Sequence, residues 1–274
     1  MEGLLAGDYR SAIHGDGTEL VQVRPYVPGD DVRRIDWNVT ARTGEPHVRV
    51  HLAERVLVTW MLLDTSPSMQ FGTADRRKAD VAEGVAIAVG HVATRRGNRL
   101  GLVTFGDEQP RTTPPRQGRI GLIGLLAALR EEPQKNGRVG ATSLGEALDR
   151  AGTMARQRAV VVVVSDFRGP RDWRRPLLEV AARHEVVAVE IRDPAEEELP
   201  NAGALWLVDP ETGNQLRVDT RSAKLRARFA AAAAAERAEV AGVLASAGAR
   251  HVVLSTSGDW LRTFAVFLRR GSRR

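Results

Sequence analysis

Residues 56–69 read VLVTWMLLDTSPSM, an apolar run that ends in one carboxylate and two hydroxyl groups. A continuous apolar run of this length is typical of a strand that is covered on both faces in a parallel sheet. Asp64, Ser66 and Ser68 follow the run directly. In open α/β sheets the loops that leave the carboxyl ends of the strands form the ligand crevice. The stretch therefore predicts a buried strand that opens into a binding loop.

The sequence after this strand alternates between helical and strand-like patterns. Residues 77–95 place apolar side chains three or four positions apart, and 99–105 and 159–164 are short apolar runs. Further helices are expected at 120–129, 144–155 and 173–183, and a further strand at 185–191. This alternation predicts an α/β fold of the doubly wound, Rossmann-like kind, with a mostly parallel central sheet and helices on both faces.

The domain organisation is predicted from the places where this alternation of helices and strands is absent or interrupted. Residues 1–55 are polar and rich in Gly, Arg and Asp, with short alternating runs, and predict a small β-rich N-terminal module. Residues 56–268 form the α/β domain, with a hairpin insertion at about 203–219, a long alanine-rich helix over 223–247, a last strand at 251–255 and a closing helix at 260–268. Residues 269–274 form a basic tail.

Composition narrows the classes of function. The net charge is +6, yet only three of the 40 basic residues are lysines, and aromatic residues make up 5% of the chain. The dispersed arginines leave nucleic-acid binding open as an alternative, but no stacking platform is visible. The absence of cysteine excludes disulfides and thiolate metal sites. The longest apolar runs fall far short of a membrane span, so we expect a cytoplasmic protein.

Two further segments carry oxygen donors at corresponding positions. Thr142 lies just before an expected helix, and Asp166 follows the strand at 159–164. With Asp64, Ser66 and Ser68 they would bring oxygen atoms to one edge of one sheet. Oxygen ligands suit a hard cation such as Mg²⁺, with Mn²⁺ or Ca²⁺ as alternatives.

This constellation resembles the metal-ion-dependent adhesion site of von Willebrand factor A (vWA) domains. The family pattern maps onto Asp64, Ser66, Ser68, Thr142 and Asp166 without substitution. The resemblance implies that the two serines bind the metal directly, and that Thr142 and the aspartates bind directly or through water. It also implies a protein partner whose acidic side chain completes the coordination of the metal.

A second motif lies upstream. Residues 24–37 read RPYVPGDDVRRIDW and are followed by Thr40, Ala41 and Arg42. This segment resembles the signature of the DUF58 family, in which it precedes a vWA domain, although Leu20 stands where an aromatic residue is more usual. Many relatives carry an N-terminal membrane hairpin, which is not expected here. The resemblance implies a MoxR-type AAA+ ATPase as partner and an adaptor or substrate-presenting role.

The signature residues admit two interpretations. Arginine–carboxylate pairs commonly fix loop geometry, which favours an ion-paired structural network with Gly29 in a turn. The alternative is a partner-docking surface that uses the aromatic and arginine side chains. The residues concerned are Arg24, Tyr26, Gly29, Asp30, Arg33, Asp36, Trp37 and Arg42.

Catalytic alternatives lack their motifs. A haloacid-dehalogenase-type phosphatase needs a second aspartate where Ser66 stands, and neither a Gly-x-Ser-x-Gly elbow nor a Walker A loop is present. We therefore expect no enzymatic activity and name no catalytic residue; a metal-dependent hydrolase is the least favoured alternative. Arg76, Arg77 and Lys78, at the start of the first long helix, are expected to form a solvated face.

Overall fold

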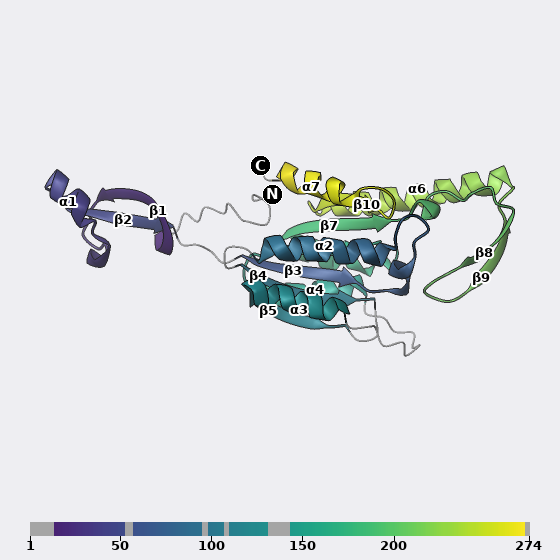
Figure 1. The fold of residues 1–274 in the computed structure, drawn as a ribbon, viewed down its shortest axis with the longest axis horizontal. Helices are drawn as coiled ribbons and strands as arrows, with labels where there is room; N and C mark the ends of the chain where they lie inside the picture. Colours follow the sequence, from purple (N-terminus) through teal and green to yellow (C-terminus); the bar gives the residue numbers. More distant parts are fainter. Residues whose placement is uncertain (1–13, 53–56, 95–97, 107–109, 131–142, 272–274) are drawn as a thin grey trace. The chain divides into compact units, whose positions relative to one another are not determined.

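The computed structural model describes residues 14–52, 57–94, 98–106, 110–130 and 143–271 (Figure 1). The chain divides into two compact units, one within residues 7–56 and one that starts at Leu57. Thr142 lies outside the described residues.

The larger unit is built on a six-stranded sheet in the order β10-β7-β6-β3-β4-β5. Five of these strands are parallel and β5 runs antiparallel to β4 at one edge. The strands are β3 (Val58–Asp64), β4 (Arg99–Phe105), β5 (Thr112–Gln117), β6 (Val160–Ser165), β7 (Glu185–Arg192) and β10 (Arg250–Ser255). The predicted mostly parallel α/β sheet is confirmed, whereas the edge strand β5 was not expected because Pro114 and Pro115 interrupt its strand pattern.

Helices cover both faces of the sheet. Side chains alternate along each strand, so Met61 and Leu63 pack into one core while Trp60 and Leu62 pack into the other. The first core is closed by α2 (Lys78–Ala93), α3 (Gly118–Arg130) and α7 (Trp260–Gly271). The second is closed by α4 (Leu144–Met154), α5 (Arg174–Ala181) and α6 (Ala223–Ser246).

Short elements connect the strands to these helices. The 3₁₀ turns are η2 (Pro67–Gln70), η4 (Arg171–Trp173) and η5 (Pro194–Glu196). A hairpin of β8 (Ala204–Val208) and β9 (Gln215–Asp219) forms a separate two-stranded sheet before α6. In Figure 1 this hairpin lies on the side toward which the arrowhead of β3 points.

The smaller unit is a twisted antiparallel pair with a helical connection. Strand β1 (His14–Pro25) pairs with β2 (His47–Leu52), and η1 (Val32–Arg34) and α1 (Trp37–Thr43) lie between them. Asp36 begins α1, because its carboxylate accepts hydrogen bonds from the amides of Asn38 and Val39. Among the helices of the described ranges, none has the length and apolar composition needed to cross a bilayer.

Candidate metal centre

The sheet places two of the predicted segments side by side. Strands β3 and β6 are parallel neighbours, with Leu63 opposite Val164, so both end at the same edge. Asp64 is the last residue of β3, and Asp166 follows the last residue of β6. The chain moves outward from β3 to β4 on one side and returns to β6 on the other. The two aspartates therefore lie at the point of the sheet where ligands bind in doubly wound folds.

Asp64 is a buried carboxylate held by its own loop and by β6. Its Oδ1 accepts a hydrogen bond of 2.9 Å from the amide of Ser66, and its Oδ2 accepts one of 2.5 Å from the hydroxyl of Ser165. Burial, together with the nearby charge of Asp166, raises the pKa of Asp64 to about 6. A buried carboxylate with a raised pKa gains from a neighbouring cation, as expected of a metal ligand.

The two serines present their hydroxyls to each other. Ser66 Oγ and Ser68 Oγ are 3.0 Å apart, and Ser68 is buried. Adjacent ligands of an octahedral Mg²⁺, with bonds of about 2.1 Å, lie roughly 3 Å apart. The hydroxyl spacing therefore fits two neighbouring positions around one such ion. Among the described residues no three His, Asp or Glu side chains form a metal cluster, so the donor set depends on these hydroxyls.

Gly106 closes the site from the neighbouring strand. It follows β4 with a φ of +85°, a conformation that favours glycine. A Cβ atom here would lie 2.7 Å from Cβ of Ser66 and 2.8 Å from Oδ1 of Asp64. The loop after β3 that carries Ser66 and Ser68, called the donor loop below, thus packs against Gly106, where there is no room for a side chain. Gly106 was not among the predicted site residues, although its place directly after a predicted strand was a signal.

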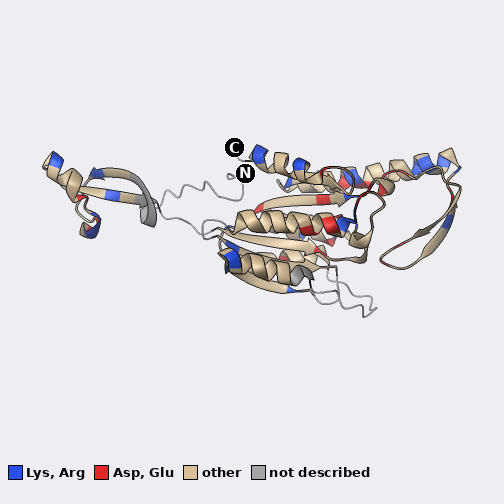
Figure 2. Cartoon of the chain, in the orientation of Figure 1, with Lys and Arg blue, Asp and Glu red and all other residues tan. Residues whose placement is uncertain are grey.

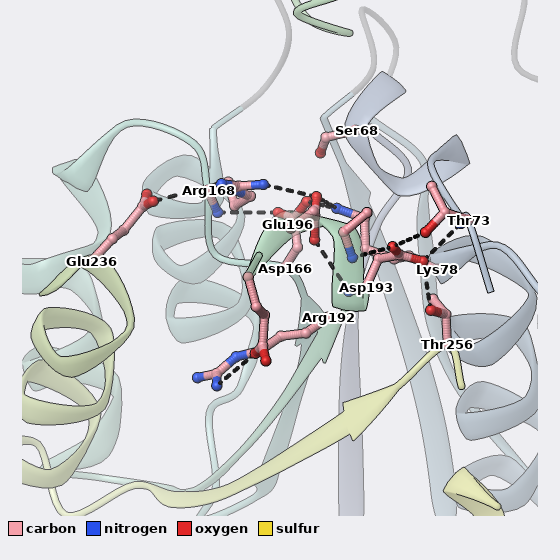
Figure 3. Close-up of polar contacts among 12 residues, drawn as sticks. Ser68, Thr73, Lys78, Asp166, Arg168, Arg192, Asp193, Glu196, Glu236 and Thr256 are labelled. Atoms are coloured by element: carbon pink, nitrogen blue, oxygen red, sulfur yellow. Dashed lines mark hydrogen bonds and ion pairs between the residues drawn. The ribbon is translucent and has the colours of Figure 1, made fainter. Parts of the chain in front are cut away.

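Asp166 has a buried counter-ion, Lys78, for which the predicted surface position is wrong. Lys78 was expected on a solvated face, but it is fully buried. Its ammonium group lies 2.6 Å from Oδ2 of Asp166 and 2.7 Å from Oε1 of Glu196 (Figure 3). Lys78 precedes Val81, Ala82 and Val85 on the buried face of α2, so the helix carries it inward with the apolar residues.

The loop after Asp166 is tightly constrained. Oδ1 of Asp166 accepts a hydrogen bond from the amide of Arg168, and the amide of Phe167 donates to Ser165 Oγ. Phe167 has a φ of +56°, which is uncommon for a bulky residue, and its buried ring packs edge-on against Trp173. Strained residues of this kind persist only where the surroundings fix them, and they cluster at functional sites.

A second buried carboxylate ties the surrounding loops together. Asp193, fully buried after β7, accepts hydrogen bonds from the amide and hydroxyl of Thr73, the hydroxyl of Thr256 and the amide of Ala195 (Figure 3). Burial disfavours the charged form, but these hydrogen bonds outweigh it and hold the pKa of Asp193 below its ordinary value. Asp193 thereby joins the loop after η2 to the ends of β7 and β10.

One contact at the site comes from the hairpin. The amide of Ser68 donates a hydrogen bond of 3.0 Å to Oε1 of Glu211, which lies between β8 and β9. Glu211 was absent from the predicted site because it lies 143 residues away in the chain. No local motif could have revealed this contact.

The N-terminal signature forms a local network inside the smaller unit. Arg24 makes two hydrogen bonds of 2.7 Å to Asp30, and Asp36 pairs with Arg49 at 2.9 Å. Gly29 lies in the turn that Asp30 closes, with a φ of +109°. Tyr26 is half-buried, whereas Arg33, Trp37 and Arg42 are exposed, with 70% of Trp37 accessible. The ion pairs hold this loop together, and Trp37 remains available at the surface.

The family model for DUF58, a protein family of unknown function, matches residues 22–239. This chain is a DUF58 protein. It is 42% identical over 275 residues to the uncharacterized protein Rv1480 of Mycobacterium tuberculosis, covering 99% of this chain and 86% of that protein.

Two solved structures are similar to this DUF58 chain to different degrees. The crystal structure of the conserved hypothetical protein BatB from Bacteroides thetaiotaomicron has a TM-score of 0.51 and 16% identity, covering 80% of this chain and 100% of that chain. The VWA domain of SpRpn10 has a TM-score of 0.41 and 16% identity, covering 77% of this chain and 94% of that chain. The larger unit of the DUF58 chain has an α/β fold with a mostly parallel sheet, and the BatB structure is similar to it.

Proposed function

We propose that this DUF58 protein is a non-catalytic, Mg²⁺-dependent protein-interaction module. The observation that carries the proposal is the convergence of Asp64, Ser66, Ser68 and Asp166 at one edge of the sheet, with the serine hydroxyls 3.0 Å apart. These are oxygen donors only, and Mg²⁺ prefers oxygen donors.

Each residue has a distinct part in holding the metal. Ser66 and Ser68 would bind it through their hydroxyls, while Asp64, Asp166 and Thr142 would bind it directly or through water. Ser165 orients Asp64, and Lys78 orients Asp166 and offsets part of its charge. When bound, the metal would supply a coordination position for a carboxylate from a partner. Because the two hydroxyl ligands carry no charge and Lys78 offsets part of the charge of Asp166, that partner carboxylate would meet a cation that the site has only partly neutralised.

The partner we propose is a MoxR-type AAA+ ATPase, as the resemblance to DUF58 implies. This protein would then act as an adaptor or substrate presenter for a chaperone-like motor. We keep a cytoplasmic location as part of this proposal, because a motor of this kind works where ATP is present.

The structure favours this proposal over nucleic-acid binding. Figure 2 shows the basic residues spread over many elements and mixed with acidic ones. Several arginines are engaged by carboxylates, including Arg168 with Glu196, Arg171 with Glu236 and Arg174 with Glu239. A paired arginine has less charge to offer a phosphate backbone.

A hydrolytic role has less support. In the part of the chain that the structure describes, the hydroxyls of Ser66 and Ser68 bond to each other rather than to a histidine or lysine that could activate them. A nucleophilic serine needs such an adjacent base.

The test is capture of a purified MoxR-type AAA+ ATPase, using the full chain as bait with Mg²⁺ or with EDTA. We expect capture in Mg²⁺, loss in EDTA and loss for Asp64→Asn. Equal capture under all three conditions would contradict the proposal. Retardation of DNA with a steep dependence on salt, and no dependence on Mg²⁺, would favour the nucleic-acid alternative.

A further inference from the structure

The tip of the β8–β9 hairpin carries a carboxylate to the loop of the candidate metal centre. Glu211 Oε1 accepts the hydrogen bond from the amide of Ser68, whose own hydroxyl is one of the proposed metal ligands. The chemical group that a partner would bring to this site is therefore already present beside it, on a segment of the same chain.

The tip is built to present Glu211. Oδ1 of Asp209 accepts a hydrogen bond from the amide of Glu211, and its Oδ2 accepts one of 2.6 Å from the hydroxyl of Thr212. The amide of Gly213 donates to the carbonyl of Asp209, and Gly213 has a φ of +71°, which suits glycine. These hydrogen bonds close a compact turn. The carboxylate of Asp209 bonds within the turn, whereas the carboxylate of Glu211 bonds to Ser68 outside it.

The hairpin is fixed at its base and at its tip, with little packing between. At the base, Thr220 is fully buried, and its hydroxyl donates to the carbonyl of Gly203 and accepts from the amide of Ala202. Between base and tip, Trp206 is 64% exposed and Leu216 is 63% exposed. A two-stranded sheet with so little apolar burial is marginal by itself. The tip can therefore leave Ser68 without opening the core of the domain.

We propose that the position beside Ser68 is a carboxylate-binding site and that Glu211 is its resident ligand. This inference rests on the proposed function, in which a partner's carboxylate binds at the same metal centre. The hairpin then competes with the partner. A tethered group acts at an effective concentration in the millimolar range, so a partner carboxylate must bind well enough to displace the tip.

The contact is tested by hydrogen–deuterium exchange on the full chain, first without metal. Glu211→Ala removes the carboxylate, and Glu198→Ala is the matched control, because Glu198 is an exposed carboxylate outside the hairpin. We expect exchange of the Ser68 amide, measured in peptides that span residues 66–71, to rise about tenfold in Glu211→Ala, the factor expected for loss of one charge-assisted hydrogen bond. The control should match the wild type. Equal exchange in all three proteins would overturn the inference.

Competition is tested with a synthetic peptide of residues 207–216, LVDPETGNQL, in the presence of Mg²⁺. The peptide should bind Glu211→Ala in calorimetry at least tenfold more tightly than it binds the wild type, in which the tip is already seated. A peptide in which glutamine replaces the glutamate should not bind. Binding of the peptide to both proteins with equal affinity, or to neither, would overturn the inference.

Failure of this inference can be told apart from failure of the proposed function. Titration of Mg²⁺ alone into the wild type tests the metal centre and does not depend on the hairpin. If Mg²⁺ binds and the exchange pattern is unchanged in Glu211→Ala, the hairpin inference fails alone. If Mg²⁺ does not bind and the exchange pattern changes, the contact stands and the proposed metal-dependent function fails.

Discussion

Lys78 and Asp166 form an ion pair of 2.6 Å in which the lysine is fully buried and the aspartate nearly so. A protein that places a lysine beside a proposed metal ligand has a cation at the site before any metal arrives. The lysine is a buried counter-ion for Asp166, and Glu196 shares the same ammonium group. This arrangement would link the stability of the domain to the charge of the candidate metal centre.

The Lys78 pair gives the first prediction. Lys78→Met leaves Asp166 and Glu196 without their buried cation, and removal of one partner of such a pair costs about 3–5 kcal/mol. We expect a lower free energy of unfolding in urea, and a larger rise in Tm on addition of Mg²⁺ than in the wild type, because the metal supplies the missing charge. Lys224→Met, at an exposed position on α6, should change neither value. A Mg²⁺ response no larger than in the wild type would contradict the role assigned to Lys78.

Gly106 gives the second prediction. Gly106→Ala puts a methyl group against Ser66 and Asp64 and adds backbone strain at a positive φ, at a cost of about 1–3 kcal/mol. We expect weaker Mg²⁺ binding in calorimetry, since the donor loop must shift. The control is Gly169→Ala, which follows Asp166 by three residues but has open space around it. Equal Mg²⁺ affinities in the two variants would show that Gly106 does not shape the site.

Asp193 gives a prediction about pH. Its folded-state pKa lies below the ordinary value, so its contribution to stability is fully present above the unfolded-state pKa and is lost as pH falls through the folded-state pKa. Asp193→Asn should lower the free energy of unfolding at neutral pH by about 1–3 kcal/mol. It should also flatten the loss of stability on acidification, measured by urea titrations from neutral pH to about pH 3. Glu198→Gln, at an exposed position, should keep the wild-type acid dependence.

The smaller unit gives a prediction that separates structure from docking. Asp36→Ala removes the cap of α1 and the pair with Arg49, and should speed amide exchange in residues 37–43. Trp37→Ala should leave exchange there unchanged, because the side chain is 70% exposed. If Trp37→Ala also leaves capture of the ATPase unchanged, Trp37 takes no part in docking the partner.

Much of the α/β domain could be predicted because its signals are local. The apolar run before Asp64 and the valine run before Ser165 identify buried parallel strands, and their shared direction places Asp64 and Asp166 at one edge. The long alanine-rich helix and the closing helix follow from composition and periodicity. The edge strand β5 was not predicted, because its two prolines argue against a strand. Prolines are tolerated there only because β5 lies at the edge of the sheet.

Most features that were not predicted from the sequence depend on contacts between residues far apart in the chain. Lys78 follows two arginines and resembles a surface residue, but its spacing from Val81, Ala82 and Val85 puts it on the buried face of α2. That spacing was a usable signal. By contrast, nothing near Glu211 indicates that it reaches Ser68, because the hairpin path alone brings the two together. The positive φ of Phe167 is equally invisible in the sequence, since bulky residues rarely adopt it.

The proposed function depends on a Mg²⁺ site formed by Asp64, Ser66, Ser68 and Asp166. The most direct test is calorimetric titration of Mg²⁺ into the full chain and into Asp64→Asn, which keeps the size of the side chain. We expect saturable binding of one ion to the wild type and no measurable binding to the variant, with both proteins folded by circular dichroism. Equal Mg²⁺ affinity in the two folded proteins, or no binding to the wild type, would contradict the claim.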